Sequence, residues 1–574
     1  MPYCDNRSVI IKRSGSFNFM KKALLPLFLF GLCCLFADSW TVLVYMAADN
    51  NLAQSGKQNL NEMESATQPE GLKLVVQADF PGERTKRYLI EQDADPDNIT
   101  SNVIKDMDNT DSGDPDTLRD FIIWGRNRYP AQRYMLVIWA HGDSWYKGSK
   151  WISPDDETSN LIGVANGELR SALAGTGYWD ILLLDACSMQ GVEIITEMQD
   201  LTEYIVASAD LVPATGFPYA QIIPILHLGS SNVAEQIPEL YQQSYLPGGI
   251  NNPSNQYLTT TCSAISTAGF SAYLEHWKSF CTSLRAYASE LADIRSDLFE
   301  MNTGYADVDL RQLLARLSTN GIPGATALLD EWNSLVLASA FTLPYPESDI
   351  GTAAIWFPDS RFNYNAAWQH YLKLNFSRTG WLGVVNLSLG GPYSAPETPD
   401  LISASTIFDR LILDIAAPLS PDSLYYQITI NDDEYTISPS AYAPQFQFSA
   451  VVEQSGSWSV TAIDQNGLRS DSLQGLFTIS SDNDQSVIVY PNPLKVPFAG
   501  RLTWKQPSES VNRLSVGVFN LRGQKVAERV FESDIPQGEL YLHDIEGFSE
   551  LSRGIYFIRL WLGKRSLQCK LTIL

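Results

Sequence analysis

Two short apolar runs constrain the fold of this chain more than any other feature. Residues 134–140 lead directly to His141, and residues 180–184 lead, through a short polar turn, to Cys187. Short apolar runs bounded by turn residues are typical of strands buried in a parallel sheet. In open α/β sheets the ligand crevice lies beyond the carboxyl ends of such strands. The pattern therefore predicts that His141 and Cys187 face one crevice, an imidazole beside a thiol.

Similar apolar runs alternate with amphipathic stretches through the first long region. Strands are predicted at residues 41–47, 72–78, 134–140, 181–184 and 204–208, and helices within residues 117–124 and 167–173. This alternation indicates βαβ units and a mostly parallel sheet. Asp114 followed by Pro115 is typical of a helix start. A helical region is expected at residues 272–291, and a strand at 353–357 is expected to return to the sheet.

The composition changes at residues 388–399, where Gly, Pro and Ser gather as in a linker. Beyond it, strand-like runs separated by turns predict two all-β sandwich domains, at residues 398–482 and 486–574. The first has the strand spacing of an immunoglobulin or fibronectin domain. The α/β domain would occupy residues 38–390, because a chain of 574 residues is too long for one core.

Residues 1–37 are interpreted as an N-terminal extension and a secretory signal. Lys21 and Lys22 precede an apolar stretch that ends near Ala37, which is the layout of a signal peptide. The apolar stretch is shorter than a transmembrane helix usually requires. Cys33 and Cys34 leave a lipid anchor as an alternative.

Charge and cysteine content narrow the possible partners. The chain has 40 basic and 65 acidic residues, a formal net charge of −25, which argues against nucleic acid or an anionic membrane surface as a partner. Four of the seven cysteines follow residue 37, too few for a disulfide framework in a chain of this size. Cys262 and Cys281 either pair or remain buried thiols, and no spacing is typical of a zinc site.

The chemistry of a Cys-His pair sets requirements on both residues. A thiol attacks as thiolate, and a helix expected at residues 189–198 would place Cys187 at its positive end, lowering the thiol pKa. His141 would act as base and then as acid. The backbone N–H groups of Gly142 and Cys187 are the candidates for binding the oxyanion. Taken alone, Cys187 is more simply explained as a buried structural thiol.

Several motifs occur in a fixed order along the α/β region. They are TVLVYMAADNNL from residue 41, SGDPDTLRDF from 112, VIWAHG from 137, DILLLDACSM from 180, ASADLVPATGFPY from 207, ADVDL from 306 and IWFP from 355. With these motifs, residues 40–385 resemble the clostripain family of cysteine peptidases. The resemblance implies a caspase-like fold with His141 and Cys187 as the catalytic dyad.

The resemblance also suggests a substrate preference and a cofactor. Members of the family often cleave after Arg or Lys and use acidic groups to bind that residue. Asp185 and Asp210 are the candidates here; their alternative roles are orienting the strand end and forming an ordinary turn. Residues 212–219 contain no acidic group, which weakens the basic preference. Calcium is a possible cofactor because some relatives need it.

No metal ligands can be assigned from the sequence. The acidic stretch at residues 93–120 lacks the alternation of an EF-hand loop. The segment 145–151 after His141 is expected to be an exposed loop, with Lys147 or Lys150 as possible processing points.

The C-terminal unit carries three further motifs, VIVYPNP from residue 487, VFNLRGQKV from 518 and GIYFIRL from 554. Their order resembles the C-terminal sorting domain of the type IX secretion system, over residues 486–574. The resemblance implies Sec export, passage through the type IX machinery, and release from the cell or attachment to the outer-membrane surface.

The sequence thus predicts an exported cysteine endopeptidase that acts on protein or peptide substrates through a thioester acyl-enzyme. Two alternatives stay open. One is an inactive surface adhesin or scaffold, and the other is a transpeptidase that uses the same acyl-enzyme.

Overall fold

The structure, a computed structural model, describes most of the chain beyond the predicted signal segment. The described residues are 39–573 except for 146–151, 255, 302–305, 343–349, 393, 408–409, 432, 440–443, 453, 465–466, 479–486, 491–499, 505–512, 533–537, 549–550, 552–553 and 564. The signal segment, Lys147 and Lys150 therefore lie outside the described residues. Within them, no helix has both the length and the apolar character required to span a bilayer.

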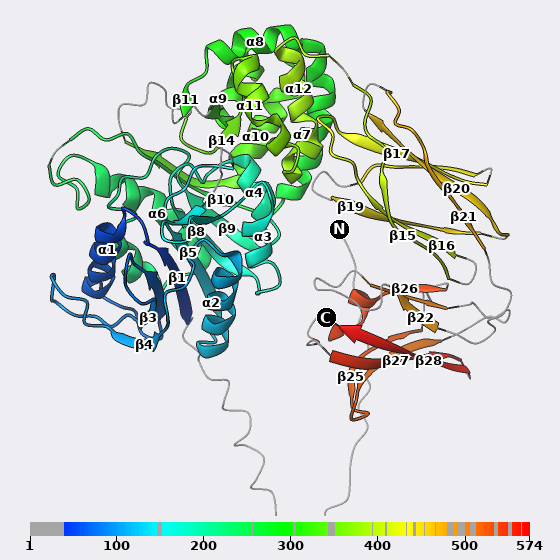
Figure 1. The fold of residues 1–574 in the computed structure, drawn as a ribbon, viewed down its shortest axis with the longest axis horizontal. Helices are drawn as coiled ribbons and strands as arrows, with labels where there is room; N and C mark the ends of the chain where they lie inside the picture. The colour runs from blue at the N-terminus through cyan, green and yellow to red at the C-terminus, as the bar shows by residue number, and fades with distance from the viewer. Residues whose placement is uncertain are drawn as a thin grey trace, which may run out of the picture. The chain divides into compact units, whose positions relative to one another are not determined.

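The α/β region is built on one nine-stranded sheet (Figure 1). Its strands, in spatial order, are β13 (Val336–Phe341), β10 (Thr261–Ser266), β9 (Thr202–Ala207), β8 (Trp179–Asp185), β5 (Arg133–Trp139), β1 (Trp40–Ala47), β2 (Lys73–Asp79), β3 (Lys86–Leu89) and β4 (Asn102–Asp106). The five central strands, β9 to β2, run parallel, and the strands at both edges pair antiparallel. The predicted α/β fold with a mostly parallel sheet is confirmed.

Helices cover both faces of this sheet, as β1 between α1 and α2 illustrates (Figure 1). One face packs against α1 (Ala53–Ser65), α5 (Tyr219–Ile222) and α6 (Ser230–Tyr245), and the other against α2 (Pro115–Arg128), α3 (Glu168–Leu173) and α4 (Val192–Met198). Successive side chains of a strand point to opposite faces, so Val42 and Val44 enter one core while Leu43 and Tyr45 enter the other. The strands are buried on both faces, which explains why their sequences are almost continuously apolar.

Helix α2 begins where the sequence predicts. The Asp114 carboxylate accepts a hydrogen bond of 2.9 Å from the backbone N–H of Asp116, and Pro115 occupies the first helical position. Leu118, Phe121 and Ile122 form its buried face. This capped, amphipathic helix packs against β1 and fixes that side of the sheet.

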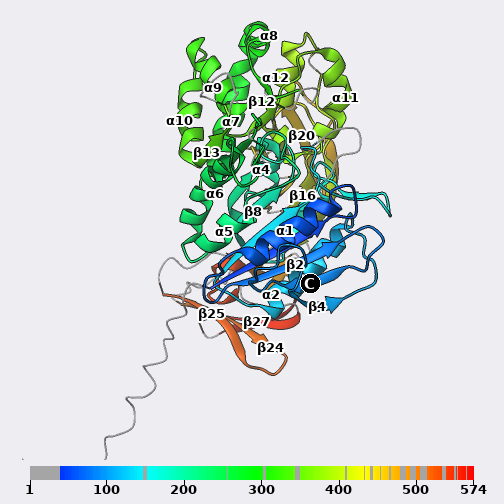
Figure 2. The ribbon, with the colours of Figure 1, turned by 90° about the vertical axis from the view of Figure 1, so that its left-hand side faces the viewer.

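A second group of helices gathers at one end of the sheet (Figures 1 and 2). They are α7 (Phe270–Leu284), α8 (Ala288–Ser296), α9 (Leu310–Thr319), α10 (Ala325–Leu335), α11 (Arg361–Tyr371) and α12 (Trp381–Ser388). The helical region predicted at residues 272–291 is therefore the start of a larger unit. Its side chains share one apolar core with α2, α3 and α4.

The prediction that residues 353–357 return to the main sheet is wrong. Strand β14 (Ala354–Trp356) pairs with β12 (Asp307–Asp309), which in turn pairs with β11 (Glu300–Met301) in a separate small sheet. The place beside β10 is taken by β13, which the sequence analysis did not identify. A single bridge between Gly191 and Ala354 joins the segment of β14 to the chain that follows β8.

From residue 400 onward the described residues form strands joined by turns, with one short 3₁₀ helix at Leu542–Asp544, in agreement with the predicted all-β region. The first unit has sheets β15-β16-β19 and β18-β17-β20-β21, and the second has β22-β23-β26 and β25-β24-β27-β28. The first unit comprises β15 (Asp400–Ile407), β16 (Arg410–Ala416), β17 (Leu424–Ile430), β18 (Asp433–Ile437), β19 (Gln445–Val451), β20 (Gly456–Asp464) and β21 (Leu473–Phe477). The second comprises β22 (Val487–Tyr490), β23 (Arg501–Trp504), β24 (Leu514–Asn520), β25 (Lys525–Phe531), β26 (Glu539–Tyr541), β27 (Gly554–Leu562) and β28 (Arg565–Ile573). Each unit has its own apolar core, while the exact domain boundaries stay predictions.

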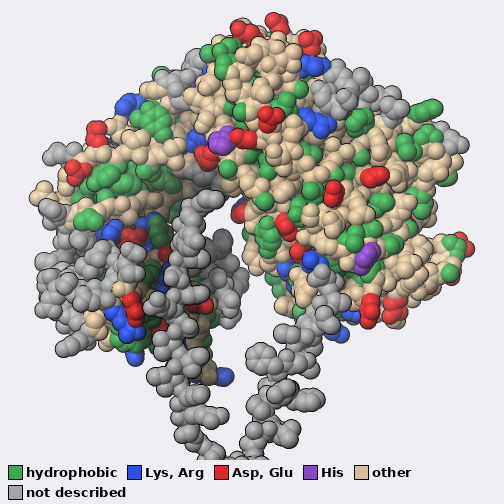
Figure 3. Space-filling model, turned by 180° about the vertical axis from the view of Figure 1, so that it is seen from behind, with side chains coloured by type: hydrophobic (Ala, Val, Ile, Leu, Met, Phe, Trp, Pro, Cys, Tyr) green, Lys and Arg blue, Asp and Glu red, His purple; other side chains and the backbone are tan. Residues whose placement is uncertain are grey.

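The surface carries charges of both signs. On the face shown in Figure 3, acidic and basic side chains are interspersed.

Cys262 and Cys281 are buried free thiols. Of the two alternatives left open by the sequence, separate thiols are therefore present and a disulfide is not.

A buried carboxyl on α4 makes the stability of the α/β region depend on pH. Glu193 is 1% exposed, and its Oε1 accepts hydrogen bonds from the Trp356 N–H (3.0 Å) and the Tyr371 hydroxyl (2.8 Å). Burial raises the pKa of Glu193 to about 7. The folded state therefore binds this proton more tightly than the unfolded chain, and the resulting stability is lost as the pH rises through about 7.

We expect Glu193→Gln to relieve this loss, because an amide oxygen accepts both hydrogen bonds and carries no charge. The free energy of unfolding of the variant minus that of the parent should be larger at pH 8 than at pH 5 by roughly 2 kcal/mol. Urea unfolding at the two pH values measures this difference. The exposed Glu239→Gln serves as the control, and an equal effect of both substitutions would contradict the prediction.

Candidate active site

Strands β5 and β8 bring His141 and Cys187 to the same edge of the sheet. The two strands are parallel neighbours in which Trp139 lies opposite Asp185, and the Ala140 N–H donates to the Asp185 carbonyl at 3.1 Å. His141 and Cys187 each follow this register pair by two residues. Both line one cavity of about 180 Å³, together with Leu52, Trp139, Ala140, Asp185, Ala186, Val212, Pro213, Ala214 and Gly216.

Gly142 allows the two strand ends to approach closely. A Cβ at this position would lie 2.6 Å from the Cys187 carbonyl oxygen and 2.8 Å from the Ala186 Cβ. Gly142 also forms a bridge with Ile152 of β6 (Ile152–Asp155), in which the Ser153 N–H donates to the His141 carbonyl at 3.3 Å. Neither the Gly142 N–H nor the Cys187 N–H has a hydrogen-bond acceptor among the described residues.

The predicted helix immediately after Cys187 does not form there. Helix α4 begins at Val192, and Cys187 instead lies in a tight turn in which Ser188 has a φ of 57°. The Ser188 N–H donates to the Asp210 carbonyl at 2.9 Å, which holds the chain in this left-handed conformation. The prediction that a helix end lowers the pKa of the thiol is therefore wrong, because four residues lie between Cys187 and the first residue of α4.

The Cys187 thiol is partly buried against the backbone of Val212. The Val212 N–H donates to Sγ at 3.3 Å, and Sγ lies 3.6 Å from the Val212 carbonyl oxygen. Burial raises the pKa of Cys187, and the carboxylates of Asp185 and Asp210 raise it further. These surroundings favour the thiol over the thiolate form of Cys187.

His141 is held by a residue that the sequence analysis did not single out. Its Nε2 lies 2.6 Å from Oδ1 of Asn51, in the loop that follows β1. Burial lowers the pKa of His141, while Asp156 opposes this shift. A neutral imidazole is the form that can accept a proton from a thiol. The sequence does contain a signal for this role. Asn51 follows the carboxyl end of β1, a third parallel strand, and so is expected at the same edge of the sheet as His141.

The two predicted specificity residues occupy different positions. Asp185 lines the cavity, but its Oδ2 accepts hydrogen bonds from the Tyr219 hydroxyl (2.7 Å) and the Phe217 N–H (3.1 Å), and burial raises its pKa to about 6. Through these two hydrogen bonds Asp185 orients the segment 212–219, which forms the opposite wall of the cavity. Asp210 is not among the residues that line this cavity; its Oδ1 accepts from the Leu211 N–H at 2.7 Å.

The segment after His141 is not simply an exposed loop. Trp145 is 1% exposed, and its ring packs edge-on against Trp356 and Tyr371 at centroid distances of 5.6 and 4.9 Å. The polar residues after Trp145 predicted that this segment is exposed. The Trp145 indole instead lies in the same apolar core as Tyr371 of α11. The His141 segment is therefore anchored on its C-terminal side.

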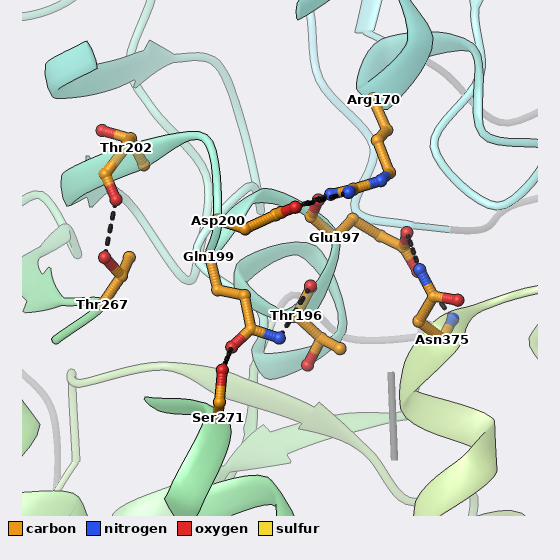
Figure 4. A network of polar contacts seen from close by, with 9 residues as sticks. All are labelled: Arg170, Thr196, Glu197, Gln199, Asp200, Thr202, Thr267, Ser271 and Asn375. Atoms are coloured by element: carbon orange, nitrogen blue, oxygen red, sulfur yellow. Dashed lines mark hydrogen bonds and ion pairs between the residues drawn. The ribbon is translucent and has the colours of Figure 1, made fainter. Parts of the chain in front are cut away.

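A network of polar contacts anchors α4, the helix that follows the cysteine turn (Figure 4). The Asn375 backbone and side-chain N–H groups donate to the Glu197 carboxylate at 2.7 and 2.8 Å. Arg170 of α3 forms two hydrogen bonds with Asp200, at 2.6 and 2.7 Å, and donates to the Glu197 carbonyl. These contacts join segments far apart in the sequence and keep the end of the helix fixed.

Residues 44–301 match the model of the clostripain family. Clostripain of Hathewaya histolytica is 26% identical over 247 residues, which cover 37% of this chain and 47% of clostripain. The chain thus spans about half the length of this curated relative.

Two solved structures are similar to this chain. A secreted C11 cysteine protease from Bacteroides thetaiotaomicron, in complex with an irreversible peptide inhibitor, is 24% identical with a TM-score of 0.48, covering 61% of this chain and 99% of that one. An inactive zymogen C11 protease from Parabacteroides distasonis is 22% identical with a TM-score of 0.48, covering 59% and 97%.

The C-terminal unit is also identified. Residues 488–574 match the model of the secretion system C-terminal sorting domain, which confirms the predicted type IX sorting domain. The match indicates type IX secretion to the cell surface or the extracellular space. The motif at residues 491–493 that helped to predict it lies outside the described residues.

Proposed function

We propose that this protein is a secreted cysteine endopeptidase with Cys187 as the nucleophile and His141 as the general base. The single observation that carries the proposal is that both side chains line one cavity at the carboxyl ends of adjacent parallel strands. The match of residues 44–301 to the clostripain family supports it.

The reaction would begin with proton transfer from the Cys187 thiol to the neutral imidazole of His141. Sγ then attacks the carbonyl carbon of the scissile bond, and the resulting oxyanion accepts hydrogen bonds from the Gly142 and Cys187 N–H groups. As the intermediate collapses, His141 protonates the leaving amine and a thioester remains. Water, deprotonated by His141, attacks the thioester, and the acid product leaves with the thiol restored.

The protonation states of the free enzyme favour this order of events. Burial raises the pKa of Cys187 and lowers the pKa of His141, so a neutral pair is favoured over a preformed ion pair. Thiolate therefore forms during catalysis, with His141 as general base, rather than in the resting enzyme.

A basic residue before the scissile bond is compatible with the cavity. Its walls are mostly apolar, including Leu52, Val212 and Pro213, and suit the methylene stem of a Lys or Arg side chain. The Asp185 carboxylate is the acidic group on the wall and would face the cationic head. Because Asp185 already accepts two hydrogen bonds, we expect this preference to be modest.

The C-terminal unit supplies the route out of the cell. The sorting domain at residues 488–574 makes the type IX secretion machinery a proposed partner, with proteins or peptides as the substrates. After export, the enzyme would be released or held at the outer-membrane surface.

A peptide library that varies the residue before the scissile bond tests the proposed function. We expect the purified mature protein, with reductant and calcium present, to hydrolyse peptides with Lys or Arg at this position about 10-fold faster than isosteric uncharged residues. Mass spectrometry separates hydrolysis from transfer to an added amine. Transfer as the main product would support a transpeptidase, and the absence of any cleavage would support a scaffold.

A further inference from the structure

One aspartate of the ADVDL motif makes a contact that the fold alone does not require. Asp309 is explained by its position, because its carboxylate caps α9 and accepts from the N–H groups of Gly351 and Thr352 at 2.7 and 3.0 Å. Asp307, two residues earlier on β12, is 4% exposed, and its side chain is hydrogen-bonded to that of Ser144. Asp307 thus contacts a segment that is distant in the sequence.

Ser144 belongs to the segment of the proposed catalytic histidine. It lies three residues after His141, is 2% exposed, and its backbone has a φ of 59°. A residue other than glycine keeps this left-handed conformation only when its surroundings hold it there. The next residue, Trp145, is fixed by edge-on ring contacts in the core. The hydrogen bond to Asp307 therefore holds the chain between the anchored tryptophan and the histidine.

A second buried acid, Glu193, lies on the cysteine side of the site. It belongs to α4, six residues after Cys187, and its Oε1 accepts from the Trp356 N–H at 3.0 Å and from the Tyr371 hydroxyl at 2.8 Å. Trp356 lies opposite Asp307 in the pairing of β12 with β14. The two acids therefore lie at the same small sheet, one in contact with the histidine segment and the other on the helix that follows the cysteine turn.

The groups around Asp307 favour its protonated form. Burial raises the pKa of Asp307 well above its usual range, the charge of Glu193 raises it further, and the Ser144 hydroxyl lowers it. Glu300 of β11 also raises this pKa, while Arg295 of α8 lowers it. The Arg295 guanidinium is already paired with Glu300 at 3.0 Å. Two buried carboxyl groups that interact in this way do not both ionise near neutral pH.

We propose that Asp307 is a positioning residue that holds His141 in place through Ser144, and that the buried pair of Asp307 and Glu193 joins the histidine segment to α4. The assignment rests on the proposed function, because it concerns the histidine that would act as the base. With its proton bound, Asp307 holds Ser144 and does not repel Glu193. As the pH rises and both acids ionise, their repulsion separates the histidine segment from α4, so hydrolysis declines.

Kinetics of variants test this role. We expect Asp307→Ala to lower kcat about 10²-fold at pH 7, because a displacement of a catalytic group by about 1 Å costs roughly this factor. KM should change by less than about 2-fold, since Asp307 is not among the described residues that line the cavity. Asp307→Asn keeps the size and hydrogen bonding of the neutral acid, so it should restore the parental kcat at pH 7 and retain it to higher pH. Ser144→Ala should reproduce the loss and replaces Asp307→Ala if that variant does not fold.

The matched control is Asp309→Asn, which changes a similarly buried aspartate two residues along β12. It removes one oxygen acceptor of backbone N–H groups, so the protein should unfold at a lower temperature while the folded enzyme keeps the parental kcat. This is the pattern of a purely structural role. The same pattern in Asp307→Ala would overturn the proposal.

Hydrogen exchange followed by mass spectrometry measures the positioning without hydrolysis. In the peptide that contains His141 and Ser144, Asp307→Ala should speed exchange by at least about 10-fold, and Asp307→Asn and Asp309→Asn should keep the parental rate. If the parent hydrolyses no peptide and this exchange pattern appears, the proposed function fails while the contact of Asp307 with the histidine segment is supported. Parental exchange in Asp307→Ala, or equal losses of kcat in Asp307→Asn and Asp307→Ala, would overturn the proposal.

Discussion

Cys187→Ala is expected to lower kcat/KM for peptide hydrolysis by at least about 10⁴-fold, the largest effect of any single substitution. The thiol forms the bond to the substrate, and no other group on the described cavity wall is positioned to replace it. The residue is small and only partly buried, so the variant should fold normally. Initial rates on the best peptide of the library measure the effect.

The matched control removes a different thiol. Cys569 is partly buried in β28 of the sorting domain, so Cys569→Ser should retain activity. If Cys187→Ala retained more than about a tenth of the parental rate while folding normally, another nucleophile would be responsible.

Gly142→Ala is expected to reduce kcat by about 10²-fold or more while the protein stays folded. The added methyl group would lie 2.6 Å from the Cys187 carbonyl oxygen, so the cysteine turn must move away from His141. A displacement of about 1 Å in a catalytic group can cost roughly 10²-fold in rate. The φ of Gly142 is not in the left-handed region, so the effect comes from crowding and not from backbone strain.

Gly229→Ala is the control for this substitution. At that position the nearest atom to an added Cβ lies 3.8 Å away, on the Arg133 side chain, and the φ of −68° suits alanine. We expect this variant to keep the parental kcat. Parental kinetics in Gly142→Ala would show that close approach of the two strand ends is unnecessary for catalysis.

Much of the α/β fold follows from local pattern. The continuous apolar runs of β1, β5 and β8 identify buried strands because both of their faces pack against helices. The register of β5 and β8 then brings His141 and Cys187 to one edge, as the positions of the two residues at the strand ends predict. The cap of α2 at Asp114 likewise depends only on neighbouring residues.

Features that depend on distant segments were missed or predicted wrongly. The hydrogen bond from Ser188 to Asp210 bends the chain after Cys187 and delays α4 until Val192, which no local pattern reveals. Trp145 is buried because α11 and β14 supply a pocket for its ring. Asn51 follows β1 and His141 follows β5, so only the assembled sheet brings these two residues together.

The most direct test of the Cys187–His141 pair is labelling with an irreversible peptide electrophile, followed by mass spectrometry of the digested protein. We predict one adduct per molecule, located on Cys187, and a labelling rate at least about 100-fold lower in His141→Ala. Adducts spread over Cys262, Cys281 and Cys569, or unchanged labelling of Cys187 without His141, would contradict the assignment of this pair as the catalytic centre.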